Sequence, residues 1–212
     1  VLVEETEYTP YFDLLQILKR DYTIVPSNES NGFLPSLEDY KSVAPSSPFL
    51  CLRSNPCNPT GQVMEGQQLK EFVSYCSEPG RGALIDEAYE FFVSPEPVSA
   101  LKYIDNIDET NIFVAGAATK GLQVPGARIG WIVASRENIN TLASYATFAF
   151  GGVSRLSQLF VETLLEKERV SLARKAVSRF YADQRDRYGK AFSEMGLELH
   201  TGKGGFYHWA KL

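Results

Sequence analysis

The sequence predicts an α/β fold in which helices cover both faces of a mostly parallel sheet. Short apolar runs of strand length recur along the chain, and segments with helical spacing of apolar residues separate several of them. That alternation is typical of parallel strands joined by crossover helices. With 212 residues and 44% hydrophobic content, the chain is also long enough to bury a substantial core.

Four apolar runs have the length expected of buried strands. Along the sequence they cover residues 48–52, 83–85, 112–115 and 129–133. Two further stretches, residues 11–19 and 66–76, carry apolar residues at helical spacing. In the second of them, Gln67, Gln68 and Lys70 are expected to face water, so its apolar side should cover the sheet.

The C-terminal part is predicted to be helical from Ser154 to about Met195. Either one very long helix or two in succession would fit, because a charged break at residues 166–169 follows an apolar stripe. The stripe consists of Leu156, Leu159, Phe160, Thr163 and Leu164.

A domain boundary is predicted within the second half of this helical stretch. We expect residues 1–185 to form a large domain and residues 186–212 to begin a small α+β domain, because the tail from Leu197 alternates towards strands around several glycines. The chain lacks an initiator Met, enters an apolar run at once and ends in a strand-like pattern. Both ends are therefore expected to be cut from a longer protein.

Composition narrows the class of protein. The net charge of −5 leaves no excess of cations for a phosphate backbone, so nucleic acid is not expected as a partner. Cys51, Cys57 and Cys76 are odd in number and lack metal-site spacing, which argues against a disulfide framework or a zinc site and favours a reducing cytoplasm. No apolar run approaches the roughly 20 residues that span a bilayer, so a soluble protein without a membrane partner is expected.

The strongest motif lies directly after the first apolar run, where residues 55–61 read Asn-Pro-Cys-Asn-Pro-Thr-Gly. A single Asn-Pro pair would indicate only a turn that leaves a strand. A match at six positions, however, is expected by chance on the order of once in 10^5 such chains.

Further motifs follow in a fixed order. Asp86-Glu87-Ala88-Tyr89 comes after the second apolar run, Lys120 after the third, and Arg128 eight residues beyond that lysine; before them, residues 4–11 include Tyr8. This set resembles the class I and II aminotransferases, which are pyridoxal 5'-phosphate (PLP) enzymes of fold type I similar to aspartate aminotransferase. The resemblance covers essentially the whole chain and implies a PLP-binding large domain.

The chemistry of PLP explains why these residue types are needed. The cofactor requires an amine, and the resemblance assigns Lys120 as the catalytic Schiff-base lysine that also shuttles a proton. A largely buried pocket could lower the pKa of such a lysine far enough for it to act as a base. Asp86 would pair with the pyridine nitrogen; the alternative use is as a helix N-cap, and the adjacent Glu87 is expected to be structural.

The remaining cofactor contacts also come from the resemblance. Asn58 and Tyr89 would hydrogen-bond the ring O3', and Tyr8 would stack on the ring face. Arg128 would bind the phosphate, and Thr119 could add a hydroxyl. A turn asparagine, a core tyrosine and a surface arginine are the corresponding structural alternatives.

Two features depart from the family or fall outside this chain. The family has a Ser three residues before the lysine, where this sequence has Ala117, so one phosphate donor is missing or replaced. The phosphate loop would precede Val1, and the arginine for the substrate α-carboxylate would follow Leu212. Arg155 is a candidate for contact with an acidic substrate side chain across a dimer; the alternative is a helix-start arginine after the N-cap Ser154.

The leading hypothesis is a PLP-dependent aminotransferase that moves an amino group between an amino acid and a 2-oxo acid and that forms a homodimer, as the resemblance implies. A lyase or decarboxylase on the same fold remains open. From another class, the chain could be the ligand-sensing module of a transcription regulator, which an N-terminal DNA-binding segment would reveal. A degenerate homologue without activity is the fourth possibility. No metal is expected, and His200 and His208 have no partner that suggests catalysis.

Overall fold

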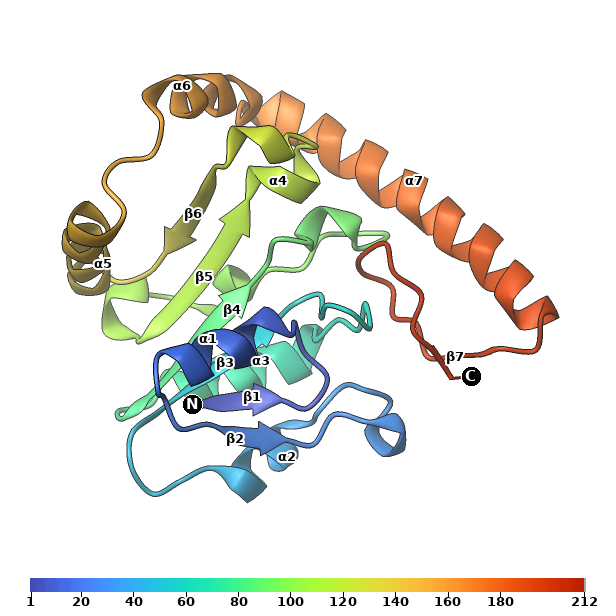
Figure 1. Ribbon diagram of the computed structural model, residues 1–212, viewed down its shortest axis with the longest axis horizontal. Helices are drawn as coiled ribbons and strands as arrows, with labels where there is room; N and C mark the ends of the chain where they lie inside the picture. Colours follow the sequence, from blue (N-terminus) through green and yellow to red (C-terminus); the bar gives the residue numbers. More distant parts are fainter. Residues whose placement is uncertain (212) are drawn as a thin grey trace.

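The computed structural model describes residues 1–211 and contains a central six-stranded sheet (Figure 1). The strands lie in the spatial order β2-β1-β3-β4-β5-β6, in which every neighbouring pair is parallel except β5 and β6. Their bounds are β1 Leu2–Glu4, β2 Thr23–Val25, β3 Phe49–Ser54, β4 Arg81–Asp86, β5 Ile112–Ala117 and β6 Gly130–Val133. The predicted fold class, an α/β protein with a mostly parallel sheet, is confirmed.

Seven α-helices and five short 3-10 helices connect the strands within residues 1–211. The α-helices are α1 Pro10–Ile17, α2 Leu37–Val43, α3 Gly66–Cys76, α4 Ala118–Gly121, α5 Arg136–Ala149, α6 Arg155–Leu164 and α7 Lys167–Glu194. The 3-10 helices are η1 Glu29–Asn31, η2 Glu90–Phe92, η3 Ala100–Tyr103, η4 Ile107–Glu109 and η5 Pro125–Ala127.

Helices cover both faces of the sheet, as predicted. On one face, α2 and α3 pack in a core with Cys51, Ala83 and Ile85 of the strands. On the other face, Leu15 of α1 packs in a smaller cluster with Leu52 of β3. Figure 1 shows α1 in front of the sheet and α3 behind it. Successive residues of β3, Cys51 and Leu52, therefore enter opposite layers, as the two-residue period of a strand requires.

Local sequence explains where several elements begin. Helix α1 has Pro10 at its first position, where the missing amide costs no hydrogen bond. In α2, the Ser36 side chain accepts from the Asp39 amide at 3.3 Å while the Asp39 side chain accepts from the Ser36 amide, a capping box. Helix α3 has the predicted bounds. Strands β1 and β2, by contrast, have three residues each, too short for the sequence pattern to reveal them.

The predicted C-terminal helical stretch consists of two helices, α6 and α7, which only Leu165 and Glu166 separate; the other residues of the predicted charged break, 167–169, already belong to α7. Helix α7 then runs without interruption to Glu194, so no break in it marks residue 185, and the division into domains 1–185 and 186–212 stays a prediction. After α7, β7 (Glu198–Leu199) and β8 (Ala210–Lys211) form a separate antiparallel pair.

The C-terminal loop lies against the Asn-Pro-Thr-Gly turn. The Gly202 amide donates to the Thr60 carbonyl and the Gly204 amide to the Gly61 carbonyl, both at 2.8 Å. A Cβ on Gly61 would stand 2.2 Å from the Gly204 carbonyl oxygen, and the positive φ of Gly61, 72°, also favours glycine. Only glycine therefore permits this close approach, which brings the tail back to the sheet.

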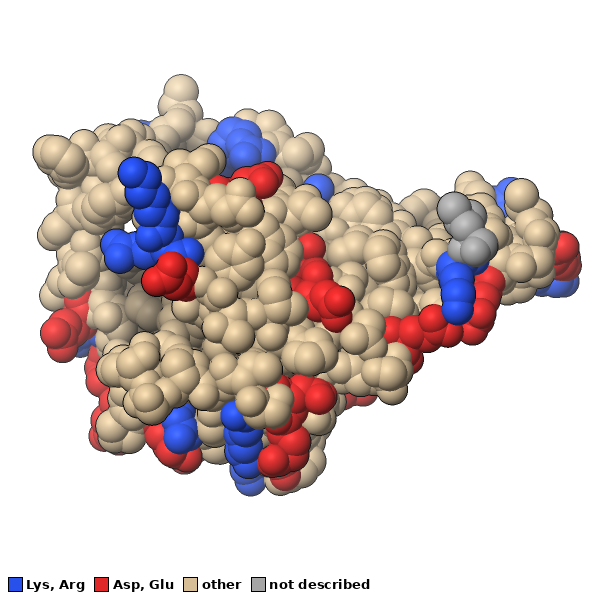
Figure 2. All heavy atoms as spheres, turned by 60° about the horizontal axis from the view of Figure 1, so that its bottom comes forward, with Lys and Arg blue, Asp and Glu red and all other residues tan. Residues whose placement is uncertain are grey.

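Charged side chains are spread over the surface. On the face in Figure 2, Lys and Arg are interspersed with Asp and Glu around larger uncharged areas. Among the helices within residues 1–211, none combines the length and the hydropathy that crossing a bilayer would demand.

Candidate active site

The carboxyl ends of three neighbouring strands meet at one edge of the sheet. β3 ends at Ser54, β4 at Asp86 and β5 at Ala117, and the register places Asp86 opposite both Ser54 and Ala115. The segments that follow these ends carry three predicted site residues: Asn58 and Tyr89 in loops, and Lys120 in the short helix α4. This edge is where open parallel sheets bind ligands, because the loops after successive strands converge there.

Asp86 makes two hydrogen bonds with its carboxylate. Oδ1 accepts from the Ala88 amide at 2.9 Å, which is the local, cap-like use that the sequence offered as an alternative. Oδ2 accepts from the Tyr11 hydroxyl at 2.5 Å. Burial and the charge of Asp86 raise the pKa of Tyr11, so this hydroxyl stays protonated and remains a donor. One oxygen of Asp86 therefore stabilises the turn after β4, and the other contacts Tyr11 at the site.

Lys120 lies in α4, immediately after β5, and is partly buried. Its Nζ stands 5.8 Å from the Tyr89 ring centroid and 5.4 Å from that of Phe206. Within residues 1–211, Nζ has no hydrogen bond or ion pair with any side chain. The amine is therefore held between aromatic faces with its donors unused.

Tyr89 is the most enclosed of the predicted site residues, with 8% of its surface exposed. Its hydroxyl lies 3.1 Å from that of Tyr207, and its ring contacts those of Phe92 and Phe206. Burial, followed by the hydrogen bond with Tyr207, raises the pKa of Tyr89. The hydroxyl is therefore neutral near pH 7 and can donate to an acceptor in the site.

Tyr8 and Asn58 face a common cavity of about 460 Å³, which Tyr207 and Trp209 also line. The Tyr8 ring meets that of Tyr11 edge-on, with 5.3 Å between centroids, and leaves 42% of the residue exposed. Within residues 1–211, the Asn58 side-chain amide has no hydrogen-bond partner. Both groups are thus open to a ligand.

Arg128 is exposed, and its guanidinium donates only to the Pro125 carbonyl, at 3.3 Å, within residues 1–211. Its backbone adopts the left-handed region, with φ 53° and ψ 44°, which is unfavourable for a residue other than glycine. Such outliers concentrate at functional sites, because surrounding structure must hold them. The partly buried Thr119 directly precedes Lys120 in α4.

Arg155 is not brought into this group. It is an exposed first residue of α6, and the Ser154 hydroxyl caps the helix by accepting from the Ser157 amide at 3.3 Å. That geometry matches the structural alternative for Arg155. Its role toward a substrate stays a prediction.

The family model for aminotransferase class I and II matches residues 1–212, the whole chain. The chain belongs to the class I and II aminotransferases.

Curated relatives within this aminotransferase family show moderate identity. A probable aspartate/prephenate aminotransferase of Aquifex aeolicus (strain VF5) is 29% identical over 190 residues, which cover 86% of this chain and 47% of the relative. The 1-aminocyclopropane-1-carboxylate synthase 6 of Oryza sativa subsp. japonica is 27% identical over 76% of this chain and 31% of its own length. The chain thus spans about half the length, or less, of the curated relatives that it matches.

Solved aminotransferases share the fold. The aromatic aminotransferase of Pyrococcus horikoshii OT3 superposes with a TM-score of 0.89 at 21% identity, over 100% of this chain and 57% of that structure. A Thermus thermophilus aspartate aminotransferase double mutant gives 0.88 at 20% identity, over 99% and 54%. At such identities the comparison establishes the architecture alone.

The donor set at the carboxyl edge fits PLP, on which this family depends. An aldehyde needs an unengaged amine, the pyridine nitrogen needs a carboxylate, and a phenolic oxygen needs neutral donors. Lys120, Asp86, Asn58 and Tyr89 supply these groups from one edge. The phosphate is served less fully within this chain, because the family's serine is replaced by Ala117 and only Thr119 and Arg128 remain near Lys120 in sequence.

The sequence did not reveal four residues at this site. Tyr11 follows Tyr8 by three residues, the spacing that places both on one side of a starting helix, so helical spacing could have indicated it. Phe206 and Tyr207 reach the site from a segment that is more than 100 residues away from Tyr89, and no local pattern encodes that contact. Glu7 lies beneath the site, where its carboxylate accepts from the Ser54 amide at the end of β3.

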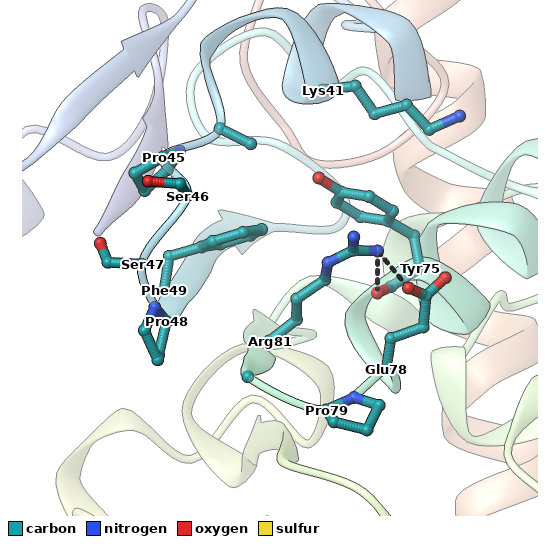
Figure 3. A pocket seen from close by; sticks show the side chains of 12 residues that line it. Lys41, Pro45, Ser46, Ser47, Pro48, Phe49, Tyr75, Glu78, Pro79 and Arg81 are labelled. Carbon is teal, nitrogen blue, oxygen red and sulfur yellow. Dashed lines mark hydrogen bonds and ion pairs between the residues drawn. The ribbon is translucent and has the colours of Figure 1, made fainter.

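A larger cavity, about 770 Å³, lies at the opposite edge of the sheet, where β3 and β4 begin (Figure 3). Figure 3 shows Arg81 joined to Glu78 and to the Tyr75 carbonyl; the ion pair measures 2.7 Å. Lys41 likewise pairs with Glu38 at 2.7 Å. Both cations are already neutralised by side chains three residues away, and no predicted site residue lines this cavity.

Proposed function

We propose that this chain carries the PLP-binding part of an aminotransferase, which moves an amino group between an amino acid and a 2-oxo acid. The observation that carries the proposal is the unpaired Lys120 amine beside Tyr89, at the same sheet edge as Asp86 and Asn58. Membership of the family supports it, and so does the name of the Aquifex aeolicus relative, a probable aspartate/prephenate aminotransferase.

Each residue has a defined task in this proposal. When bound, PLP supplies an electron-withdrawing ring that stabilises negative charge at the substrate Cα. Asp86 holds the ring nitrogen protonated, and the Tyr11 hydroxyl fixes the orientation of its carboxylate. Asn58 and Tyr89 donate to the ring O3', and Tyr8 covers one ring face. Thr119 and Arg128 bind the phosphate.

Lys120 does the covalent and proton-transfer work. Its amine would hold the cofactor through the aldehyde carbon, with loss of water, and when free it would take the proton from the substrate Cα and deliver it at the cofactor C4'. The rings of Tyr89 and Phe206 flank Nζ and limit the water around it. A reactive proton can therefore be moved with less competition from solvent.

We also propose that the enzyme is a cytoplasmic homodimer. In residues 1–211 the three cysteines are buried free thiols, which suits a reducing compartment. Large apolar side chains on α5 and α6 are exposed, including Phe148 at 91% and Leu156 at 80%. Such side chains are compatible with burial against further protein.

Elimination is the second candidate reaction, because one relative is named a synthase of 1-aminocyclopropane-1-carboxylate instead of an aminotransferase. An amino-donor screen separates the two. The full-length chain, loaded with PLP, is incubated with each amino acid and 2-oxoglutarate, and the products are measured by mass spectrometry. The proposal predicts glutamate formed in equal amount to a new 2-oxo acid. Ammonia or a cyclised product without glutamate would support elimination and contradict the proposal.

A further inference from the structure

Glu7 is a buried carboxylate directly beneath the residues proposed to hold the cofactor. Only 3% of its surface is exposed. Its Oε1 accepts from the Tyr8 amide at 2.7 Å and from the Ser54 hydroxyl, and its Oε2 accepts from the Ser54 amide at 2.6 Å. One carboxylate thus receives three hydrogen bonds, all from residues that adjoin the site.

The Ser54 hydroxyl extends these bonds to the Asn58 loop. It accepts from the Asn58 amide at 3.0 Å while donating to Glu7. A second tie joins the same two segments, because the Cys57 thiol donates to the Thr6 carbonyl at 3.3 Å. The segment with Tyr8 and the loop with Asn58 are therefore fastened to each other mainly through Glu7 and Ser54.

We propose that Glu7 is a positioning residue which, through Ser54, sets the placement of Tyr8 relative to Asn58 and thereby controls the affinity for PLP. This inference rests on the proposed function and deepens it. Glu7 itself touches neither the cavity-facing amide of Asn58 nor the ring of Tyr8; it acts through their backbone amides.

Protonation of Glu7 breaks this arrangement. The ionised carboxylate is acceptor-only and satisfies all three donors, whereas a protonated carboxyl must donate one hydrogen to a neighbour. The two amides and the Ser54 hydroxyl all point donors at it, and the Ser54 oxygen already accepts from Asn58. The protonated form of Glu7 therefore loses at least one of the hydrogen bonds that connect Tyr8, Glu7, Ser54 and Asn58.

The surroundings of Glu7 raise its pKa, so that its carboxylate is protonated at a pH near neutrality. Burial, and then the charge of Glu4 on β1, raise the pKa of Glu7 to about 7. The other facing groups are Arg53 of β3, Cys57 of the loop and Tyr11 of α1. Arg53 is committed to Glu4 at 2.9 Å, and burial raises the pKa of Cys57 to about 12, so neither titrates near pH 7.

A metal ion is a weaker reading of the same cluster. Glu4, Glu7 and Cys57 offer ligand atoms within 4.8 Å of one another. The permanent charge of Arg53 already neutralises Glu4, and three donors occupy the Glu7 oxygens. A second cation would have to displace these bonds in a dry interior.

The test is the affinity of the full-length chain for PLP, measured by fluorescence quenching at pH 6 and pH 8 in wild type and Glu7→Gln. Because Gln cannot accept all three bonds, we expect PLP to bind the variant about tenfold more weakly at pH 8. At pH 6 most wild-type Glu7 is protonated and, like Gln, uncharged. The difference in PLP affinity between wild type and the variant should therefore shrink to about twofold. Comparing variants at each pH cancels the titration of PLP itself.

Glu87→Gln is the matched control. Glu87 is also buried, and burial likewise raises its pKa to about 7, but its Oε1 accepts from the Ala100 amide, away from Tyr8 and Asn58. This variant should bind PLP as wild type does at both pH values. Ser54→Ala tests the same chain of bonds if Glu7→Gln fails to fold: it should weaken binding about threefold to tenfold at pH 8, with a native circular dichroism spectrum.

Hydrogen exchange supplies a readout without cofactor. In apo protein at pH 8, Glu7→Gln should accelerate exchange in peptides that contain the amides of Tyr8, Ser54 and Asn58. Equal affinity in folded Glu7→Gln and wild type at pH 8, or the same pH-dependent difference in Glu87→Gln, would overturn the positioning role. Either result with PLP still attached to Lys120 would leave the proposed function intact, whereas wild type that binds no PLP would overturn both.

Discussion

The two edges of the central sheet each have a cavity, but only the cavity at the carboxyl edge has the features of a ligand-binding site. The amino edge has the larger cavity, about 770 Å³ against about 460 Å³ at the carboxyl edge (Figure 3). At the amino edge, however, Lys41 and Arg81 are paired with glutamates of the same helix or turn. At the carboxyl edge, the Lys120 amine and the side-chain amide of Asn58 have no partner within residues 1–211.

The difference follows from how the chain builds each edge. The amino edge uses neighbours three residues apart in sequence, whose charges cancel locally. The carboxyl edge joins side chains that follow three different strands, and those side chains can be left unsatisfied only because the rest of the fold supports them. Hydrogen-bond donors that lack a partner and are held by several elements therefore indicate a functional site better than the volume of a cavity does.

Of the substitutions that test the difference between the two edges, Lys120→Ala should have the largest effect, which is on transamination. Removal of the amine takes away both the covalent attachment and the base, so transamination by the full-length chain should fall by about 10^3-fold or more. Steady-state assays with the best amino donor would measure it. Lys41→Ala, at the amino edge, should retain wild-type turnover, and comparable losses in the two variants would remove the distinction between the edges.

Asp86→Ala should weaken PLP binding by about 10-fold to 100-fold and abolish measurable turnover, because it removes a charged partner from the ring nitrogen. Equilibrium titration with PLP measures the first effect. Glu78→Ala removes a carboxylate from the amino edge and serves as control, with affinity expected within twofold of wild type. An Asp86→Ala protein with unchanged affinity would show that this carboxylate does not meet the cofactor.

The stability of the carboxyl edge should depend on pH through Glu87. Its folded-state pKa is about 7 because of burial, above an unfolded value near 4.5. The folded state therefore binds the proton more tightly, so this contribution is present below about pH 4.5 and is lost as pH rises through about 7. The free energy of unfolding should fall between pH 5 and pH 8, and Glu87→Gln should reduce that fall by about 2 kcal/mol.

Urea denaturation of wild type and Glu87→Gln at the two pH values would measure this change. Glu38→Gln, an exposed substitution on α2, provides the comparison, since its pH dependence should match wild type. Identical pH dependence in Glu87→Gln and wild type would mean that the buried carboxyl does not titrate in this range.

Arg81→Ala should have the smallest effect. It removes a partly exposed ion pair with Glu78 and a contact with the Tyr75 ring, 4.1 Å from the guanidinium, together worth about 1 kcal/mol at most. Thermal unfolding should shift by only a few degrees, and PLP affinity should stay within twofold. A tenfold loss of PLP affinity would connect the amino edge to the site and contradict the comparison.

The sequence predicted the parallel sheet and helix α3 well because each depends on local periodicity, which a pattern of 66–76 or 112–115 shows directly. It missed β1 and β2, whose three residues each hold too little pattern. For the site, motif order predicted Lys120, Asp86 and Asn58, which lie at or after the carboxyl ends of three neighbouring strands; their roles stay predictions.

Contacts that depend on tertiary structure could not be predicted from the sequence. Tyr207 meets Tyr89 only because glycines at 61, 202 and 204 let the C-terminal loop approach the motif turn. Glu7 gave no signal either, since a glutamate beside Tyr8 looks like a solvated charge until β3 encloses it.

Treatment of the full-length chain with PLP and borohydride, followed by digestion and mass spectrometry, tests the central claim most directly. Reduction fixes the cofactor to whichever amine holds it. A single labelled peptide, modified at Lys120, is the predicted result. Label on another lysine such as Lys41, or no label on a folded full-length chain, would contradict the assignment of the carboxyl edge as the PLP site.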